Sequence, residues 1–568
     1  MNNKDELRGE DRRETRSASA DPALSRREWL RRGALAGLGA GVALAGTGCS
    51  DVQKAIRGAT GPAPPVWGSL PPDSPRVTQA VHVLNRAAFG PRPGDVARVA
   101  GMGAPAWIEE QLAVTKPEQT LRNLRNKNIA LPGGQKLELP EAEDFDPDED
   151  PAVRWRVGGL DIHQLEAGDP DQIYCHDDSQ LVRETGQAAL LRATYSRHQL
   201  REMMADFWTN HFNIYALKLE GRSLVPIDTE RVLRPHVLGN FEDMLTASAH
   251  SPAMLTYLDN KENKDGVANE NYAREILELH TLGVKGGYSQ KDIQAVARCF
   301  TGWTVGSGFD RAKFVYDPKR HDAGAKYIPF LHLHIAPNGQ QSDADTVIRR
   351  LALHPVTARF LATKLCRRIL GHAPEDVVQK SVSAYLKSES GSDIRAMLRP
   401  ILLDALMDPT HCKRIVKRPL DMMVSALRCL GADTDCGEPV LRHLANMGQP
   451  LYQWPMPDGF PEKSSAWTST LLPRWNFAIA LATNGMQGTV VDLHGPIEAA
   501  NATTDAETVD TLLETVLGRP HATRELATLR HQILDHVQRE ATAGVKEDGL
   551  LSEATALLLS SPSFQWKS

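Results

Sequence analysis

Apolar residues recur at intervals of three and four positions along most of the chain, with polar residues between them. This period of about 3.6 residues places apolar side chains on one face of a helix, so it predicts amphipathic helices packed around a shared core. The predicted helices cover 78–86, 95–112, 179–213, 269–282, 289–301, 343–369, 393–407, 419–430, 508–517, 523–540 and 552–559.

Two of these helices carry residue types that start and stop helices. Asn269 precedes the first and Gly283 follows it, while Ser289 and Asp292 have the spacing of a capping box at the start of the second. Strand-like alternation is rare, and its clearest examples are 313–316 and 327–335. We therefore predict a mainly α fold: one large multi-helix body with few short strands and a loop-rich insertion.

Residues 128–180 are predicted to form an acidic insertion in this body. Seven of the ten residues at 141–150 are acidic, and alternating aspartates suggest a calcium loop beginning at Asp144. An EF-hand loop needs glycine at its sixth position and glutamate at its twelfth, but those positions hold Glu149 and Trp155. A solvated acidic loop is therefore the favoured interpretation.

The first 48 residues have the order of a Tat signal peptide. Arg26 and Arg27 form a twin-arginine pair, and a run of Gly, Ala, Leu and Val follows at 33–46. That run is shorter than the ~20 apolar residues of a membrane-spanning helix, which favours a signal over an anchor. We expect the Tat translocon to export the chain to the periplasm or cell envelope.

Cys49 follows small residues in a pattern that resembles a lipobox, although Gly46 stands where a lipobox usually has leucine. We predict a lipid on Cys49, with cleavage near this position and no lipid as the alternative. Residues 49–77 contain six prolines, which favours an extended tether. The predicted organisation is a signal peptide at 1–48, the tether at 49–77 and a helical body at 78–565.

Composition and charge narrow the function. Hydrophobic residues make up 41% of the 568 residues and charged residues 24%, as in ordinary globular proteins. The formal net charge of -6 provides no basic field, so no nucleic-acid partner is expected. The seven cysteines include no C-x-x-C pair, and pairing of Cys429 with Cys436 stays open. G-x-S-x-G, P-loop, H-E-x-x-H and dinucleotide fingerprints are also missing from the sequence.

One predicted helix carries the densest set of polar candidates. In a regular helix Glu275 and Glu278 are ~60° apart, so they are candidate acid and base groups on one face. Arg274 can pair with Glu278 one turn away, and Asn271 projects between the glutamates, so both are candidate binding residues. His280 lies ~140° from Glu275, which weakens a zinc site built from all three. A buried ion-pair network with His280 as a core histidine is the favoured structural interpretation.

A second group of candidates ends the helix before residue 213. Trp208 and Asn210 provide an aromatic ring and a polar group that suit binding of a sugar unit. His211 follows them directly and is a candidate metal ligand. Its aromatic neighbours favour a packed histidine as the alternative.

The loop residues His321 and Asp322 are candidate catalytic residues, because a histidine beside an aspartate in a loop is well placed for chemistry. The cofactor is unknown, with a divalent metal as the one type considered. His211 and His280 are its candidate ligands, and a set of His211, Glu275 and His321 is also chemically plausible.

Asp458 and Trp303 complete the candidate binding residues. Asp458 lies in a proline-rich loop near Trp454 and Phe460. This composition suits stacking on a carbohydrate and equally suits a structural clamp.

Several motifs follow one another along the chain in a fixed order. They are 84–90, 207–212, 269–283, 300–303, 321–322, 354–355, 457–461, 472–477 and 558–562. Together they resemble the bacterial exported family known as domain of unknown function 1800, over about residues 78–564. The resemblance implies export and a helical fold and implies no particular activity.

Two functions agree with these patterns. The first is a metal- or carboxylate-dependent enzyme acting on an envelope polymer such as a polysaccharide. The alternative is a non-catalytic envelope factor that binds glycan or a partner protein; in both, only a lipid on Cys49 contacts the membrane. A pocket that brings His211 or His321 within about 3–5 Å of Glu275 or Glu278 would favour the enzyme, and separate locations would favour the binding factor.

Overall fold

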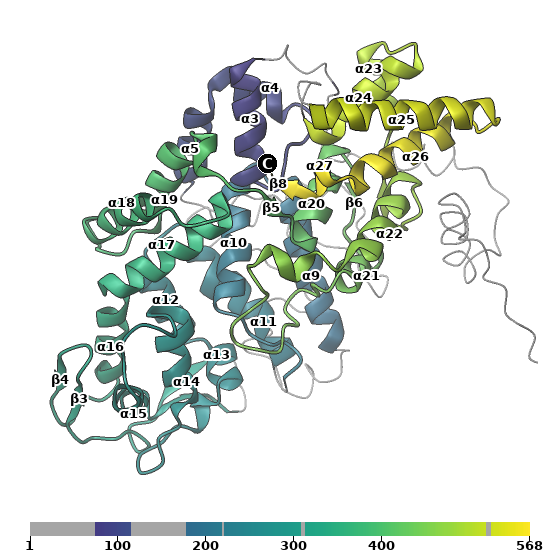
Figure 1. Ribbon diagram of the computed structural model, residues 1–568. Helices are drawn as coiled ribbons and strands as arrows, with labels where there is room; N and C mark the ends of the chain where they lie inside the picture. The colour runs from purple at the N-terminus through teal and green to yellow at the C-terminus, as the bar shows by residue number, and fades with distance from the viewer. Residues whose placement is uncertain are drawn as a thin grey trace, which may run out of the picture. The chain divides into compact units, whose positions relative to one another are not determined.

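A computed structural model describes residues 67, 74–114, 178–218, 221–307, 313–518 and 524–567, all within the unit at 61–568. Helices make up most of these residues, and the short strands pair two by two (Figure 1). The predicted mainly α fold is confirmed.

Several predicted features lie outside the described residues: the signal peptide, Cys49, most of the tether, and residues 128–177 of the acidic insertion. Export and lipid attachment therefore stay predictions. Among the helices of the described ranges, none combines the length and apolar character needed to cross a membrane. Cys429 and Cys436 are both described, and no disulfide joins them.

The described body begins with α3 (Pro75–Arg86), α4 (Asp95–Met102) and α5 (Ala104–Leu112). α3 starts three residues before the predicted start at residue 78 because the chain caps it earlier. The Ser74 hydroxyl accepts a hydrogen bond from the Val77 amide (3.3 Å), and Pro75 suits the first helical turn.

The first described helix and the last strand lie side by side. β8 (Trp566–Lys567) pairs antiparallel with β5 (Ile415–Val416), close to α3 in Figure 1. The buried Arg86 guanidinium, at the end of α3, donates to the carbonyls of Lys413 (2.8 Å) and Lys567 (3.1 Å). These bonds connect the two ends of the helical body.

A group of helices in the middle of the chain forms the walls of the site described below or packs against those walls. They are α9 (Asp178–Tyr195), α10 (Gln199–His211), α11 (Gly221–Ile227), η2 (Asp228–Leu233), η3 (Arg234–His236), α12 (Phe241–Ala249) and α13 (Pro252–Tyr257). α11 contains Pro226, which lacks a backbone donor, and passes directly into η2, a π-helix. π-Helical turns are frequent at functional sites.

The helix predicted at 269–282 consists of two elements, α14 (Glu270–Glu275) and the π-helix η5 (Ile276–Thr281). Its start agrees with the prediction, because the Asn269 side chain accepts a hydrogen bond from the Asn271 amide (2.9 Å).

The second half of this segment departs from the regular helix that we expected. The Leu282 amide donates to the Leu277 carbonyl, five residues back, at 2.9 Å. The 100° per residue of an α-helix therefore does not apply beyond Glu275, and the angles predicted for Glu278 and His280 are wrong.

α15 (Gln290–Cys299) begins with the predicted capping box. The Ser289 amide and hydroxyl both donate to the Asp292 carboxylate, at 2.7 and 2.6 Å.

The stretch predicted as one strand at 327–335 is a hairpin of β3 (Lys326–Ile328) and β4 (Leu333–Ile335). His332 lies between the strands with a positive φ of 47°, so it belongs to the turn. The other pairs are β1 (Trp303–Val305) with β2 (Phe314–Tyr316), and β6 (Asp433–Thr434) with β7 (Thr489–Val490).

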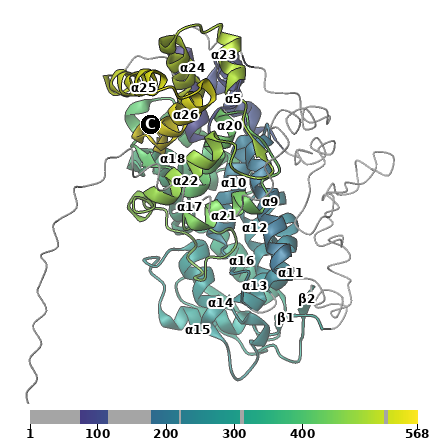
Figure 2. The same cartoon turned by 90° about the vertical axis from the view of Figure 1, so that its right-hand side faces the viewer.

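α20 (Pro419–Cys429) is the centre of the body, because every one of its residues is buried. Figures 1 and 2 show it between α9 and the C-terminal helices. The remaining elements are η4 (Asn260–Glu262), α16 (Ser342–Ala352), α17 (Pro355–Leu370), α18 (Glu375–Leu386), α19 (Ile394–Arg399), η7 (Pro400–Ala405), η8 (Pro409–His411), α21 (Glu438–Asn446), η9 (Ser464–Trp467), α22 (Leu471–Ala482), α23 (His494–Ala500), α24 (Asp505–Leu517), α25 (Arg524–Thr542), α26 (Glu547–Ser560) and α27 (Pro562–Gln565).

Candidate functional site

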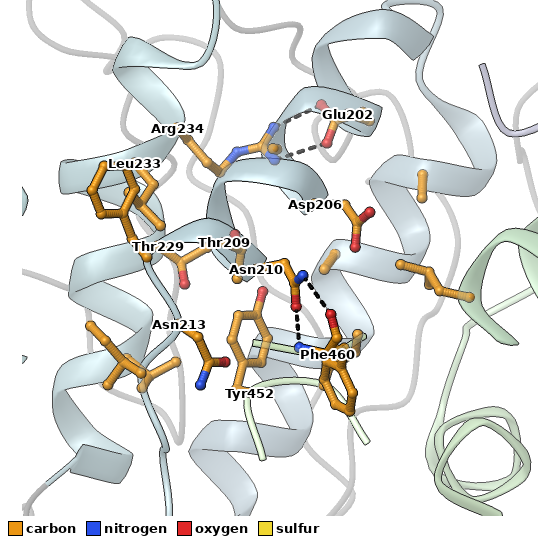
Figure 3. A pocket seen from close by; sticks show the side chains of 18 of the residues that line it. Glu202, Asp206, Thr209, Asn210, Asn213, Thr229, Leu233, Arg234, Tyr452 and Phe460 are labelled. Carbon is orange, nitrogen blue, oxygen red and sulfur yellow. Dashed lines mark hydrogen bonds and ion pairs between the residues drawn. The ribbon is translucent and has the colours of Figure 1, made fainter. Parts of the chain in front are cut away.

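A polar cavity of about 70 Å³ lies where α9, α10, η2 and the loop after α21 meet (Figure 3). This is room for about five water molecules, or for the hydroxyl-bearing part of one sugar unit. Carboxylate, guanidinium, hydroxyl and amide groups line the cavity, together with apolar side chains such as Leu233 and Phe460.

α10 supplies one wall of the cavity. Glu202, Asp206 and Thr209 are four and three residues apart, so successive turns of the helix deliver them to the same face. Asp206, Thr209 and Asn210 are partly exposed whereas Glu202 is buried. The cavity therefore opens at the C-terminal half of α10.

Glu202 forms a buried, two-pronged ion pair with Arg234 (Figure 3). The guanidinium donates Nη1 to Oε2 at 2.8 Å and Nη2 to Oε1 at 2.7 Å. Burial opposes ionisation of Glu202, but the charge and hydrogen bonds of Arg234 outweigh it and hold the pKa of this carboxyl below its usual value. Glu202 therefore lines the cavity as an ionised carboxylate, and both of its oxygens are bonded to Arg234.

A second buried pair lies beside the first. Arg192 on α9 donates two hydrogen bonds to Glu230 on η2, at 2.5 and 3.0 Å. Arg234 also approaches Glu230, with 3.8 Å between nitrogen and oxygen. The two arginines and two glutamates balance one another's charge.

Asp206 belongs to a further ion-pair network. Arg368 (3.3 Å) and Arg418 both donate to Asp206, and both also donate to Asp421, which Lys567 binds at 3.0 Å. Burial lowers the pKa of Lys567 to about 7, despite the attraction of Asp421. Asp206 therefore faces the cavity with its charge already compensated.

Asp228 differs from these carboxylates because its hydrogen-bond partner is a hydroxyl. The Ser251 hydroxyl donates to Asp228 Oδ1 at 2.5 Å, and both residues are buried. Burial raises the pKa of Asp228 to about 7, and the Ser251 hydrogen bond only partly opposes this shift.

Tyr452 is held in a strained backbone conformation at the cavity, with a positive φ of 61°. Its carbonyl accepts from the Ala216 amide at 2.8 Å. In Figure 3 its hydroxyl points towards Thr229 and Asn210. Burial, reinforced by the charge of Glu230, raises the pKa of this phenol to about 12, so the hydroxyl is a neutral donor and acceptor.

Amide side chains fix the loop that closes the cavity. Asn210 donates to the Phe460 carbonyl (3.1 Å) and accepts from the Phe460 amide (2.7 Å), as Figure 3 shows. Asn213 donates to the carbonyls of Trp454 (3.0 Å) and Met456 (2.7 Å). Asn210, predicted from the sequence as a binding residue, thus lines the cavity and also positions this loop.

The predicted residues Glu275 and Asp458 lie in a different neighbourhood, where Glu275 is half-buried and Asp458 is exposed. Glu275 makes no hydrogen bond or ion pair with any residue that the structure describes. Burial raises its pKa, and the charges of Glu278 and Asp458 raise it further. Asp458 accepts one hydrogen bond from the Trp454 indole (3.0 Å).

The predicted pairing of Arg274 with Glu278 is confirmed, at 3.5 Å. Arg274 also pairs with Glu270 at 3.2 Å, so its charge is shared within the helix. Asn271, the other predicted binding residue here, donates to Asp259 at 3.5 Å.

His211 and His280 lie close together, with ring centroids 6.1 Å apart. His211 Nε2 donates to the His280 carbonyl (3.1 Å), since a carbonyl only accepts, and Nδ1 accepts from the Lys364 ammonium (3.2 Å). Burial and the Lys364 charge lower the pKa of both histidines, that of His280 to about 3. Both are neutral core histidines.

The loop pair His321 and Asp322 makes its contacts elsewhere. His321 bonds to the Thr301 carbonyl through Nδ1 (2.8 Å) and to Asp343 through Nε2 (3.2 Å), all of them buried. Asp322 accepts two hydrogen bonds from Arg298, at 2.5 and 3.1 Å. Neither residue joins Glu275 in a common set of hydrogen bonds.

In the described ranges, no three or more His, Cys, Asp or Glu side chains are arranged to hold a metal ion. The set of His211, Glu275 and His321 is therefore not assembled. The pair His211 and His280 is also a poor site, because Lys364 occupies a ring nitrogen of His211 and brings a positive charge.

Two predicted binding residues, Trp208 and Trp303, are fully buried in the core. The Trp208 indole donates to the Val237 carbonyl at 3.0 Å. Neither ring is available to stack on a surface ligand, so we do not include them in the site.

The sequence did not predict four residues that line the cavity, Arg192, Glu202, Arg234 and Tyr452, or the residue Glu230, which pairs with Arg192. One signal was present, because the charged residues Arg201 and Glu202 stand between Leu200 and the two methionines Met203 and Met204 of a helix. A charge in such a position needs a buried partner, but the partners lie 32 and 38 residues apart in the chain.

Comparison with known proteins gives one match. The family model described as protein of unknown function, DUF1800, matches residues 82–566. Neither the curated proteins nor the solved structures contain a match. Because the family model spans most of the sequence, from α3 to β8, the chain belongs to the DUF1800 family.

Proposed function

We propose that this protein is an exported cell-envelope protein that binds a neutral, hydroxyl-rich group, such as one sugar unit of an envelope polymer, in the cavity of Figure 3. The observation that carries the proposal is the lining of this cavity. Hydroxyl and amide groups stand there beside carboxylates whose charge arginines already compensate.

A neutral ligand agrees with this electrostatic balance. The guanidinium groups of Arg192 and Arg234 are engaged by Glu230 and Glu202, so an anion entering the cavity finds no uncommitted arginine in its lining. A charged ligand would lose its hydration without gaining a counter-charge, which is costly. A polyhydroxylated group exchanges hydrogen bonds with water for hydrogen bonds with Thr209 and the neighbouring hydroxyls.

Binding is favoured over catalysis because the predicted catalytic groups occupy separate neighbourhoods. His211 bonds to Lys364 and the His280 backbone, and His321 bonds to Asp343. Glu275 has neither histidine as a hydrogen-bond partner.

Calorimetric titration with N-acetylglucosamine, glucose and glucuronic acid tests this proposal. We expect the two neutral sugars to bind more tightly than the charged one. Tyr452→Phe and Thr229→Val should each weaken binding about fivefold, the loss of about one hydrogen bond. Tyr327→Phe and Thr483→Val, which alter exposed residues, are the matched controls. Equal losses of sugar affinity in the cavity variants and in the control variants would reject the proposal. Tighter binding of glucuronic acid than of the neutral sugars would also reject it.

A carboxylate-dependent enzyme is the second candidate, and the unpartnered Glu275 near Asp458 favours it. A half-buried carboxyl with a raised pKa suits a general acid. Release of reducing ends from purified cell-wall polysaccharide, lost in Glu275→Gln and kept in Glu270→Gln, would support this activity. The same release rate in wild type and Glu275→Gln would exclude Glu275 from it.

A further inference from the structure

We propose that Asp228 is a protonated ligand contact, whose carboxyl O–H donates a hydrogen bond to an oxygen of the group bound in the cavity. The proposal rests on the proposed function for the ligand, and it adds the residue that makes binding depend on pH. Its basis is the difference between Asp228 and the other carboxyl groups that line the cavity.

Of the lining carboxylates, Glu202 and Asp206 each bind arginine. Asp228 is 5% exposed and forms no ion pair with any described residue. An isolated carboxylate is costly in such surroundings, so the neutral acid is the favoured form. A neutral carboxyl has one O–H group that can donate a hydrogen bond, whereas the ionised carboxylate of an ion pair can only accept.

Ser251 fixes how Asp228 presents its carboxyl. The Ser251 hydroxyl caps α13 by accepting from the Met254 amide (3.5 Å), so its own proton is free to donate to Asp228 Oδ1 (2.5 Å). Because Oδ1 accepts from the serine, Oδ2 remains as the oxygen that carries the acid proton. Asp228 lines the cavity, and the bound group is the acceptor for that proton.

The other charged and titratable groups around the cavity come from every element packed there. They are Arg192 on α9, Glu202 and Asp206 on α10, Glu230 on η2, Arg234 on η3 and Tyr452 in the closing loop. The arginines are paired with the glutamates, so their fields largely cancel at Asp228. Burial is then the dominant influence, and it raises the pKa of Asp228 to about 7.

Binding should therefore decline in alkaline solution. Below pH 6 the carboxyl donates, and affinity should not change with pH. Above pH 8 the ionised carboxylate can only accept, and affinity should fall by about tenfold per pH unit while the protonated form remains the binding form. Asp228→Asn keeps a donor and an acceptor of similar shape, so its affinity should not vary with pH.

Infrared difference spectroscopy tests the protonation without any ligand. The carbonyl band of a buried protonated carboxyl should be present at pH 5, lost by pH 9, and missing in Asp228→Asn but not in Asp404→Asn, an exposed control. Ser251→Ala provides a second variant, because losing the serine hydrogen bond should move the midpoint to higher pH. A spectrum at pH 5 identical in wild type and Asp228→Asn would overturn the proposal.

Calorimetric titration with N-acetylglucosamine from pH 5 to 9 completes the test. Affinity that declines in wild type and stays constant in Asp228→Asn supports the proposal. Affinity that stays constant with pH in both wild type and Asp228→Asn overturns the donor role of Asp228 and leaves the proposed function intact. If the carbonyl band of Asp228 behaves as expected but N-acetylglucosamine does not bind at any pH, the proposed function is overturned. The donor role of Asp228 is then overturned as well.

Discussion

Glu202 and Arg234 are 32 residues apart in the chain, yet they share two hydrogen bonds inside the body. The pair joins α10 to η3 across one wall of the cavity. Their side chains are 5% and 10% exposed, so either partner alone would leave a buried charge uncompensated.

Glu202→Gln should therefore lower the free energy of unfolding by about 3–5 kcal/mol. Glu110→Gln breaks an exposed pair with Arg98 and should cost less than about 1 kcal/mol. Urea unfolding followed by tryptophan fluorescence measures both values. Similar losses for the two variants would contradict the structural role assigned to the buried pair.

Stability should also depend on pH through Asp228. Its pKa is raised from 3.8 to about 7, so between these values the folded state binds more protons than the unfolded state. Stability therefore falls as pH rises from 4 to 7, by up to about 4 kcal/mol. Asp228→Asn cannot titrate and should lose less stability than wild type over this interval. Parallel pH–stability curves for the two proteins would contradict the raised pKa.

Gly459 allows the closing loop to approach α10. Its φ is 72°, and a Cβ there would lie 2.2 Å from the Asn210 carbonyl oxygen. Gly459→Ala should destabilise the protein by more than Gly448→Ala, where φ is 89° and a Cβ meets nothing within 4 Å. Thermal unfolding compares the two, and hydrogen exchange at the Phe460 amide should be faster only in Gly459→Ala. Equal effects would mean that backbone strain alone, without the close contact, determines this position.

Export should require the twin arginines. Replacing both Arg26 and Arg27 by lysine should leave a full-length precursor in the cytoplasm, because the Tat pathway depends on this pair. The same change at Arg31 and Arg32 is the control and should leave export intact. Immunoblots of cell fractions distinguish the two. Export of the Arg26 and Arg27 double variant would disprove the Tat prediction.

Lipid attachment at Cys49 predicts membrane association after export. Cys49→Ala should move the protein from the membrane fraction to the soluble fraction, because the lipid on Cys49 supplies the membrane anchor. Metabolic labelling with a palmitate analogue should mark wild type and not the variant. Wild type in the soluble fraction without label would show that the alternative, cleavage without lipid, is correct.

The local parts of the fold were predictable from sequence, and the long-range parts were not. Asn269 and the pair Ser289 and Asp292 start helices because their side chains bond to amides two or three residues away. The π-helical turns of η5 have no distinct residue pattern, so the regular helix predicted there was wrong in its second half.

For the cavity, too, only the local features could be predicted from the sequence. The spacing of Glu202 and Asp206 places both on one face of α10, and that much follows from helix geometry. Their partners Arg234 and Arg418 come from distant segments, and the strained φ of Tyr452 depends on the packing of its loop. Such pairings depend on tertiary packing, and the periodicity of a single sequence does not reveal which distant segments pack together.

A crystal structure of the protein with N-acetylglucosamine bound tests the central claim most directly. The account predicts the sugar inside the cavity of Figure 3, with its hydroxyls within hydrogen-bond distance of Tyr452 and Asp228. A sugar bound only between Glu275 and Asp458, with the cavity holding water alone, would contradict it.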